Sequence, residues 1–152
     1  MDLDHFKSIN DTYGHLTGDL VLQTVSGQMS ASQQTREVLA RYGGEEFVLL
    51  LPDAGLAQAS ERAEQMRTTV ARTAVRTEHG LLGVTMSCGV AALIRDNGES
   101  LLQMIEQADR ALYSAKQSGL NCVLAWMDGT TSEQGSMSPR GQISSPAGLL
   151  QA

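Results

Sequence analysis

RYGGEEFVLLL, at residues 41–51, joins two glycines to a pair of carboxylates and then to an uninterrupted apolar run. An apolar segment bounded by Gly43 and Gly44 is typical of one arm of a β-hairpin. The carboxylates Glu45 and Glu46 would then stand at the tip, where glycines let a ligand approach the backbone. Acidic side chains beside a buried strand are costly unless a positive partner meets them. On its own, the stretch therefore indicates either a solvated turn or a cation site.

The composition is that of one acidic globular domain. Its 152 residues are enough to bury a core, and an aromatic share of only 4% leaves aliphatic side chains to fill it. The net charge of −6 argues against a general nucleic-acid or anionic-membrane binder. Cys88 and Cys122 have neither metal-ligand nor disulfide-framework spacing, which favours reduced thiols in a cytoplasmic domain. No apolar run approaches the roughly 18 residues of a membrane span, so any membrane anchor would lie in upstream sequence.

Helical and strand patterns alternate along the chain and predict an α/β (α+β) fold. Hairpins interleaved with single helices favour a mixed, largely antiparallel central sheet flanked by helices. Gly89, inside a strand pattern, predicts a bulge or a close backbone approach. Residues 128–152 lack any period and are predicted to be a disordered tail. The expected elements are a strand end at 2–4, a short helix from Lys7 to Asn10, a helix restarting at Gly18–Asp19 and running to Met29, strands at 38–42 and 46–51, a helix at 56–70, one or two strands within 81–93, a helix at 100–116 and a strand at 121–126.

Chemistry-bearing residues fall into four separated clusters. Asp2 and Glu45 would converge if their strands are neighbours, and two carboxylates with a backbone carbonyl suit Mg²⁺. Lysines would supply point charges for phosphates. An amide and a carboxylate can read a purine edge, and a carboxylate pairs well with the adjacent N–H donors of guanine. The clusters are DLD at 2–4, the set Lys7, Asn10 and Asp19, GGEE at 43–46, and Lys116 at a helix end.

Four motifs resemble, in order and spacing, the GGDEF family of diguanylate cyclases. They are DLDHFKSINDTYGHLTGD at 2–19, RYGGEEF at 41–47, VTMSCGVA at 84–91 and ADRALYSAK at 108–116. The resemblance covers residues 1–127. It implies synthesis of cyclic di-GMP from two GTP with release of pyrophosphate, in bacterial second-messenger signalling. It also implies a fold similar to nucleotidyl cyclases and polymerase palm domains, and a homodimer in which each domain holds one GTP.

The resemblance implies a role for each matching residue. Asp2 and Glu45 would bind two Mg²⁺ ions per site, with the backbone carbonyl of Leu3 helping. Glu45 would also assist deprotonation of the attacking 3′-hydroxyl. Positioning and charge neutralisation would then carry most of the catalysis. The other implied contacts are guanine at Asn10 and Asp19, phosphates at Lys7 and Lys116, and a close-approach turn at Gly43 and Gly44.

Three departures from the family pattern have consequences. Leu120 stands where the family commonly has a phosphate-binding arginine, which predicts weaker GTP binding. Gln34 and Glu37 occupy the positions of an inhibitory RxxD tetrad, and an amide cannot grip a phosphate as a guanidinium does. No feedback inhibition is therefore expected at that place. The chain also begins inside the expected first strand, as a GGDEF domain lacking its first helix and most of that strand, and an upstream sensor domain is possible.

Two functions of different classes stay open from the sequence. The first is a diguanylate cyclase, which the intact Asp2, Glu45 and guanine-type residues favour. The second is a degenerate, catalytically impaired domain that binds GTP or cyclic di-GMP as a regulator, which Leu120 and the short first strand favour. In either case we expect Asp4 and Glu46 to support the fold rather than bind metal directly.

Overall fold

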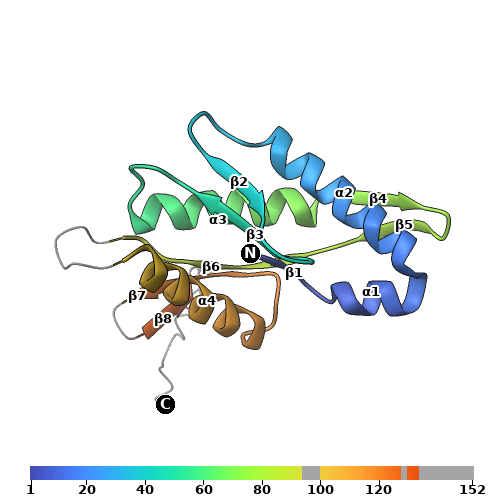
Figure 1. The fold of residues 1–152 in the computed structure, drawn as a ribbon. Coiled ribbons are helices and arrows are strands. Elements are labelled where there is room, and N and C mark those ends of the chain that lie inside the picture. The colour runs from blue at the N-terminus through green and yellow to red at the C-terminus, as the bar shows by residue number, and fades with distance from the viewer. Residues whose placement is uncertain (94–99, 128–129, 134–152) are drawn as a thin grey trace, which may run out of the picture.

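The computed structural model describes residues 1–93 and 100–127 and the backbone of residues 130–133 (Figure 1). Its helices are α1 (Phe6–Tyr13), α2 (His15–Ala31), α3 (Leu56–Ala71) and α4 (Leu101–Gln117). Its strands are β1 (Asp2–Leu3), β2 (Val38–Arg41), β3 (Phe47–Leu50), β4 (Ala74–Thr77), β5 (Gly80–Gly83), β6 (Met86–Val90), β7 (Val123–Met127) and β8 (Thr130–Glu133).

A four-stranded sheet in the order β1-β6-β7-β8 forms the centre of the molecule. Its β6–β7 pair is parallel, whereas β1–β6 and β7–β8 are antiparallel. Two antiparallel hairpins, β2–β3 and β4–β5, stand beside it. An antiparallel bridge between Asp2 and Glu46 ties the tip of the β2–β3 hairpin to β1. The predicted mixed, largely antiparallel α/β fold is therefore confirmed.

Strand β6 has a helix packed on each face. Successive strand residues point to opposite faces, and buried Cys88 lies 4.0 Å from the carbonyl of Ala63 in α3. Burial raises the pKa of the Cys88 thiol to about 12. Gly89 faces α4, where an added Cβ would collide with the backbone of Ala108 and Leu112. The predicted close approach at Gly89 is confirmed, and it places α3 and α4 on opposite faces of the strand.

The second helix begins earlier than the sequence predicts. Gly14, with φ 82°, separates α1 from α2, and α2 begins at His15. The Gly18–Asp19 pair therefore lies inside α2 and not at its start. The glycine serves packing, because a Cβ at Gly18 would collide with the side chain of Asn10. Gly18 thus lets α1 lie close against α2, with Asn10 against the residue that precedes Asp19.

Two regions differ from their predicted structure. The sequence does not predict the β4–β5 hairpin, and the stretch 81–93 divides between β5 and β6, which belong to different sheets. Within the stretch predicted to be disordered, Thr130–Glu133 form β8 paired with β7. The remainder of that tail, 128–129 and 134–152, lies outside the described residues.

The core is aliphatic, as the low aromatic content predicts. Its fully buried members include Val21, Val25, Met29, Met66, Val70 and Met86. A groove of about 390 Å³ between β3, the end of β6 and α4 is lined mainly by apolar residues such as Phe47, Val90 and Leu112. Across the part of the chain that the structure describes, no helix combines the length and apolar character needed to cross a membrane.

Candidate functional site

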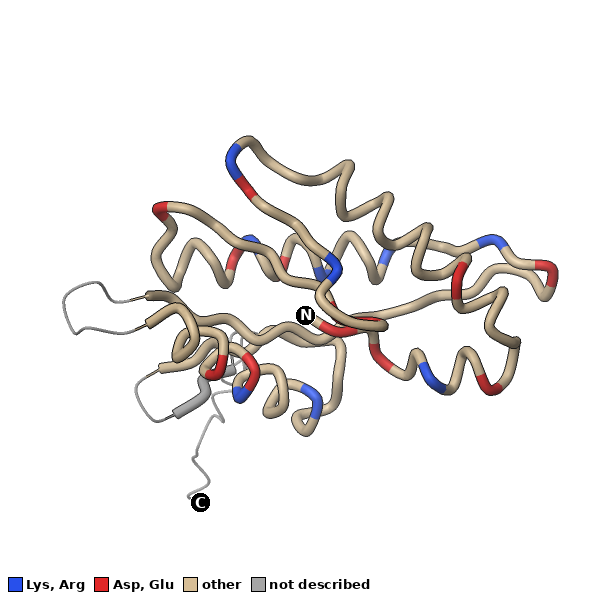
Figure 2. The backbone as a smooth tube through the Cα atoms, in the orientation of Figure 1, with Lys and Arg blue, Asp and Glu red and all other residues tan. Residues whose placement is uncertain are grey.

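The GGEE turn lies directly against β1. The amide of Leu3 donates to the carbonyl of Glu45 at 3.2 Å, and the amide of Phe47 donates to the carbonyl of Met1 at 2.9 Å. Figure 2 shows the acidic positions of β1 and of the turn gathered beside the N-terminus. The convergence of Asp2 with Glu45, expected only if their strands were neighbours, is what the fold produces.

Lys116, in the last turn of α4, forms an ion pair with Asp2. Its Nζ lies 2.5 Å from Asp2 Oδ1. The Asp2 side chain is only 8% exposed, whereas that of Lys116 is 36% exposed. Asp2 Oδ2 accepts no hydrogen bond from the described residues. Because every fully buried side-chain oxygen among those residues has a partner, Oδ2 keeps some contact with solvent. One oxygen of Asp2 is thus held by an ammonium and the other is available.

Glu45 is an under-compensated carboxylate. Its pKa is raised first by desolvation and next by the charge of Asp2, with a further contribution from Glu46, and Lys116 only partly opposes these effects. A carboxylate in such surroundings gains from a nearby cation.

The donors around Glu45 suit a cation that is shared with a ligand. Asp2, Glu45 and a strand carbonyl fit Mg²⁺, which takes one or two protein carboxylates and completes its shell with water and phosphate oxygens. Over residues 1–93 and 100–127, no three His, Cys, Asp or Glu side chains are grouped to hold a metal ion by themselves. The donor set is therefore incomplete without oxygens from a bound molecule.

Asp4 has the fold-supporting role predicted for it. Its Oδ1 accepts from the Ser87 hydroxyl at 2.7 Å, and its Oδ2 accepts from the Thr85 hydroxyl at 2.7 Å and the Asn121 amide at 2.9 Å. The residue is only 3% exposed. With three donors satisfying both oxygens, Asp4 joins β1, β6 and the loop before β7.

Arg41 braces the GGEE turn, a role that the sequence does not predict. Its Nε donates to the carbonyls of Gly43 and Gly44 at 3.1 Å each, and its Nη2 donates to that of Gly44 at 2.6 Å. The Glu46 carbonyl in turn accepts from the amides of Tyr42 and Gly43. A Cβ on Gly43 would collide with the Glu46 carboxylate. Arg41 binds backbone carbonyls, which every residue has, so no side-chain pattern in the sequence predicts this contact.

The predicted base-binding residues lie together on the α1–α2 hairpin. Asn10 is half-buried against Gly18, and Asp19 is exposed on the next position of α2. Asp19 also borders a depression of about 440 Å³ that reaches Gln23 and Arg41. Lys7 is exposed on α1 and makes no ion pair with the described residues. The structure therefore brings Asp2, Glu45 and Lys116 together and places Asn10 against Gly18, the residue before Asp19.

Leu120 follows the lysine of the site in a left-handed turn. Gly119, Leu120 and Asn121 have φ values of 116°, 65° and 47°. A left-handed conformation is unfavourable for leucine. Arg67 of α3 is the cation that contacts this turn. Its Nη1 donates to Asn121 Oδ1 at 2.6 Å, and its guanidinium also pairs with Glu64. No arginine stands at the position where the family commonly has one.

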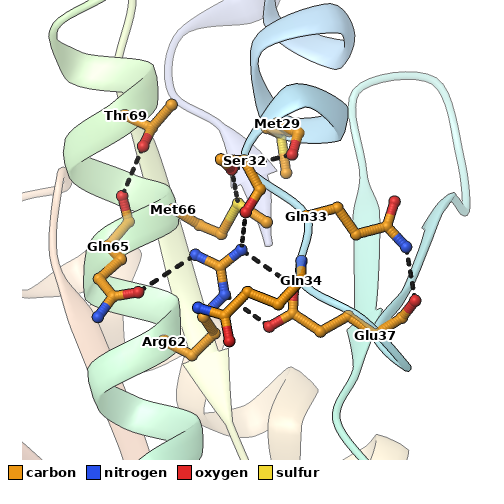
Figure 3. A network of polar contacts seen from close by, with 9 residues as sticks. All are labelled: Met29, Ser32, Gln33, Gln34, Glu37, Arg62, Gln65, Met66 and Thr69. Carbon is orange, nitrogen blue, oxygen red and sulfur yellow. Dashed lines mark hydrogen bonds and ion pairs between the residues drawn. The ribbon is translucent and has the colours of Figure 1, made fainter.

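Glu37 belongs to a closed polar network (Figure 3). Arg62 of α3 donates from Nε to Glu37 Oε1 at 2.6 Å and from Nη2 to Oε2 at 3.0 Å. The amide of Gln34 donates to Oε2 at 2.8 Å, and Arg62 Nη2 also reaches the Ser32 carbonyl at 2.6 Å. The Arg62 and Glu37 side chains are only 9% and 7% exposed. The carboxylate at this position is thus already fully occupied within the chain.

Comparison with known proteins agrees with this geometry. Residues 1–122 match the family model described as diguanylate cyclase, GGDEF domain. Diguanylate cyclase A of Treponema denticola is 40% identical over 123 residues, which cover 81% of this chain and 33% of that protein. The chain thus spans about a third of the length of that relative.

Two solved structures share the fold. Diguanylate cyclase SiaD from Pseudomonas aeruginosa, solved with its activator SiaC, has a TM-score of 0.75 and 39% identity over 82% of this chain and 47% of its own. The active GGEEF domain of a diguanylate cyclase from Vibrio cholerae has a TM-score of 0.75 and 30% identity over 83% of this chain and 79% of its own. The chain therefore belongs to the GGDEF family of diguanylate cyclase domains.

Proposed function

We propose that this domain condenses two GTP molecules into cyclic di-GMP and releases two pyrophosphates. In each half-reaction a 3′-oxygen forms a bond to the α-phosphorus of the other nucleotide, and the bond from that phosphorus to the β-phosphate oxygen breaks. The observation that carries the proposal is the convergence of Asp2, Glu45 and Lys116 on one edge of the sheet. Two carboxylates can bind the metal of a metal-bound polyphosphate, and one ammonium can bind its phosphate oxygens.

The chain's own groups would divide the work by chemistry. When bound, Mg²⁺ supplies charge neutralisation at the phosphates and lowers the pKa of an attacking hydroxyl. Asp2 Oδ2, the Leu3 carbonyl and Glu45 would hold it. Glu45, whose pKa is raised, is also suited to accept the hydroxyl proton. Lys116 would bind phosphate oxygens on the same side.

The α1–α2 hairpin would bind the base and part of the phosphate chain. Asn10 lies against Gly18, the residue before Asp19, so the two side chains would offer an amide and a carboxylate to the guanine edge. Lys7, without an ion pair in the described part of the chain, is available for phosphate. Of the two turn glycines, Gly43 faces the Glu46 carboxylate, whereas at Gly44 an added Cβ would meet nothing within 4 Å, which leaves that side of the turn open to the nucleotide. Since two GTP must meet, we also propose that two such domains associate face to face during catalysis.

The test is product formation by the purified domain. Incubation with GTP and Mg²⁺ followed by mass spectrometry should yield cyclic di-GMP, and Glu45→Gln should abolish it. Glu46→Gln is the matched control, because this exposed neighbour is expected to support the turn only. Failure of the wild-type domain to form product while it still binds GTP would overturn the cyclase assignment.

A second function has one specific observation in its favour. Leu120 replaces the arginine that the family commonly places at the phosphates, which weakens the substrate grip. A domain with GTP binding but no turnover would act as a GTP- or cyclic di-GMP-binding regulator. Calorimetric titration with GTP and with cyclic di-GMP, run beside the product assay, separates the two functions.

We further propose that product does not inhibit this domain at Gln34 and Glu37. Arg62 and the backbone amide of Gln34 already occupy both oxygens of Glu37. The side chain of Gln34 carries no charge with which to bind a phosphate. Added cyclic di-GMP should not lower the initial rate of the wild-type domain at this place. Any dependence of the rate on added product should therefore be the same in Gln34→Ala as in wild type. Inhibition that disappears in Gln34→Ala would contradict the proposal.

A further inference from the structure

Lys116 holds one oxygen of the Asp2 carboxylate, whose other oxygen a metal ion at this site would approach. We propose that Lys116 is an internal competitor of the divalent cation at Asp2, and that nucleotide phosphates remove this competition by giving the lysine another partner. The inference rests on the proposed function, because it takes Asp2 as a metal ligand. It assigns to Lys116 a role in the nucleotide-free domain, in addition to contact with phosphate.

The first argument is the geometry of the pair. Lys116 Nζ lies 2.5 Å from Asp2 Oδ1, and Asp2 is largely buried. A cation liganded by the same carboxylate would lie within a few ångströms of the ammonium, where two positive charges repel strongly in partly desolvated surroundings. The lysine must therefore withdraw, or the metal binds less tightly.

The second argument is the charge around the pair. Asp2, Glu45 and Glu46 gather where the tip of the β2–β3 hairpin bridges to β1, and Lys116 is the cation paired with Asp2. Without metal, the ammonium thus holds together carboxylates that would otherwise repel one another. In the metal-free domain a single lysine supplies part of the neutralisation that a divalent cation would supply when bound.

The third argument is that Lys116 can move without the backbone. It sits at the penultimate position of α4, and α4 is fixed on β6 by the backbone contact at Gly89. The side chain is 36% exposed and has a flexible four-carbon stem. It can therefore turn from Asp2 toward a phosphate in solvent while the helix stays in place.

Metal and nucleotide binding are consequently coupled through this one side chain. A polyphosphate attracts the ammonium away from Asp2 and so removes its repulsion of a cation on the same carboxylate. Nucleotide therefore raises the affinity for metal, and by linkage metal raises the affinity for nucleotide. In the absence of nucleotide, the site takes up free cation weakly. The coupling should be lost when the lysine is replaced by an uncharged residue of similar length.

The test measures Mn²⁺ binding to the nucleotide-free domain by electron paramagnetic resonance of the free ion. Lys116→Met should bind Mn²⁺ about 5-fold or more tightly than wild type, a coupling of ordinary size. Lys7→Met is the matched control: it removes the same charge from a lysine without an ion pair in the described residues, and should leave the affinity unchanged. Equal affinity in Lys116→Met and wild type, or an equal gain in Lys7→Met, would overturn the proposal.

A second readout follows the lysine itself in the wild-type domain. Titration with Mg²⁺ should shift the ¹⁵Nζ resonance of Lys116 from its ion-paired position, and half of the shift should be reached at the metal dissociation constant. A resonance that stays fixed while metal binds contradicts the exchange. Asp2→Asn should remove most Mn²⁺ binding, and unchanged binding in this variant also overturns the proposal.

These measurements contain no GTP, so they are independent of turnover. Absence of cyclic di-GMP together with tighter Mn²⁺ binding in Lys116→Met would reject the proposed activity and leave the competition intact.

Discussion

The Glu37–Arg62 network and the Asp2–Glu45–Lys116 cluster use similar side chains to opposite effect. In the network, both oxygens of Glu37 are held by a bidentate guanidinium and a backbone amide, and the pKa of Glu37 is lowered, chiefly by the Arg62 hydrogen bonds. In the cluster, one ammonium serves two carboxylates and the pKa of Glu45 is raised. The Glu37–Arg62 network is a complete set, because its carboxylate has all its partners, and it fixes the loop before β2. The Asp2–Glu45–Lys116 cluster is an incomplete set, because its carboxylates need a further cation from a ligand.

The largest effect is expected on catalysis from the incomplete set. Glu45→Gln should lower kcat for cyclic di-GMP formation about 1,000-fold, since it removes a proton acceptor together with a metal donor. The melting temperature should show that the variant is folded. A loss of less than about 10-fold would mean that the cluster is not the catalytic centre.

The next largest effect is on stability, from breaking the complete set. Arg62→Met leaves the buried Glu37 carboxylate without its main partner and should cost about 3 kcal/mol of unfolding free energy, the lower end for a broken buried ion pair. Denaturant unfolding measures it. The exposed Arg36–Asp53 pair offers a control: Arg36→Met should cost less than about 1 kcal/mol. Similar losses in both variants would remove the contrast between buried and exposed pairs.

Adding a cation beside the Asp2–Glu45–Lys116 cluster should strengthen GTP binding. Leu120→Arg restores a charge where the family commonly has one, and a charge-assisted bond of about 1.5 kcal/mol would lower the KM for GTP roughly 10-fold. Steady-state kinetics with Mg²⁺ held in excess measures the change. Leu120→Lys tests whether charge alone is enough. An unchanged KM in both variants would separate this turn from the substrate.

The smallest effects are the opposite pH dependences of the two carboxylates. The folded pKa of Glu37 is below its ordinary 4.5, so Glu37 contributes stability above that value and loses it as the pH falls through the folded pKa. The folded pKa of Glu45 is above 4.5, so its contribution is present below that value and is lost as the pH rises through the folded pKa.

The two glutamine variants should therefore shift the melting temperature of the metal-free domain in opposite directions at about pH 7.5. Glu37→Gln should lower it and Glu45→Gln should raise it slightly. Both differences should shrink at about pH 4. Shifts of the same sign at neutral pH would contradict the comparison.

Sequence patterns predicted the elements whose periodicity is strong. The stripe of Leu56, Ala59, Ala63, Met66 and Val70 gave α3 almost to the residue. The β4–β5 hairpin is not predicted because only Val75 of its first strand is fully buried and its turn at Glu78–His79 lacks a strong turn pair. Gly18 was read as a helix start because a glycine that permits helix contact looks the same in sequence as one that ends a helix.

The site was predicted by residue type but not by contact. Asp2 and Glu45 are expected to converge, and the hydrogen bond from the Leu3 amide to the Glu45 carbonyl places them on adjoining segments. The ion pair between Asp2 and Lys116 spans 114 positions, and no local pattern reports such a distance. Arg41 was missed because its partners are carbonyls of the turn, which every residue possesses. Long-range side-chain contacts depend on the assembled sheet, so only the structure provides them.

Gly89 touches no substrate, yet it works as the spacer that sets the reach of Lys116. Its missing side chain lets the backbone of α4 rest on β6 at Ala108 and Leu112, and Lys116 lies one turn beyond Leu112 on the same rigid rod. Ser87, two residues earlier on β6, pairs with Asp2 in the sheet. The same strand therefore positions both Asp2 and the helix that carries Lys116. Widening that gap by a single methyl group would therefore register at the charges and not only in the core.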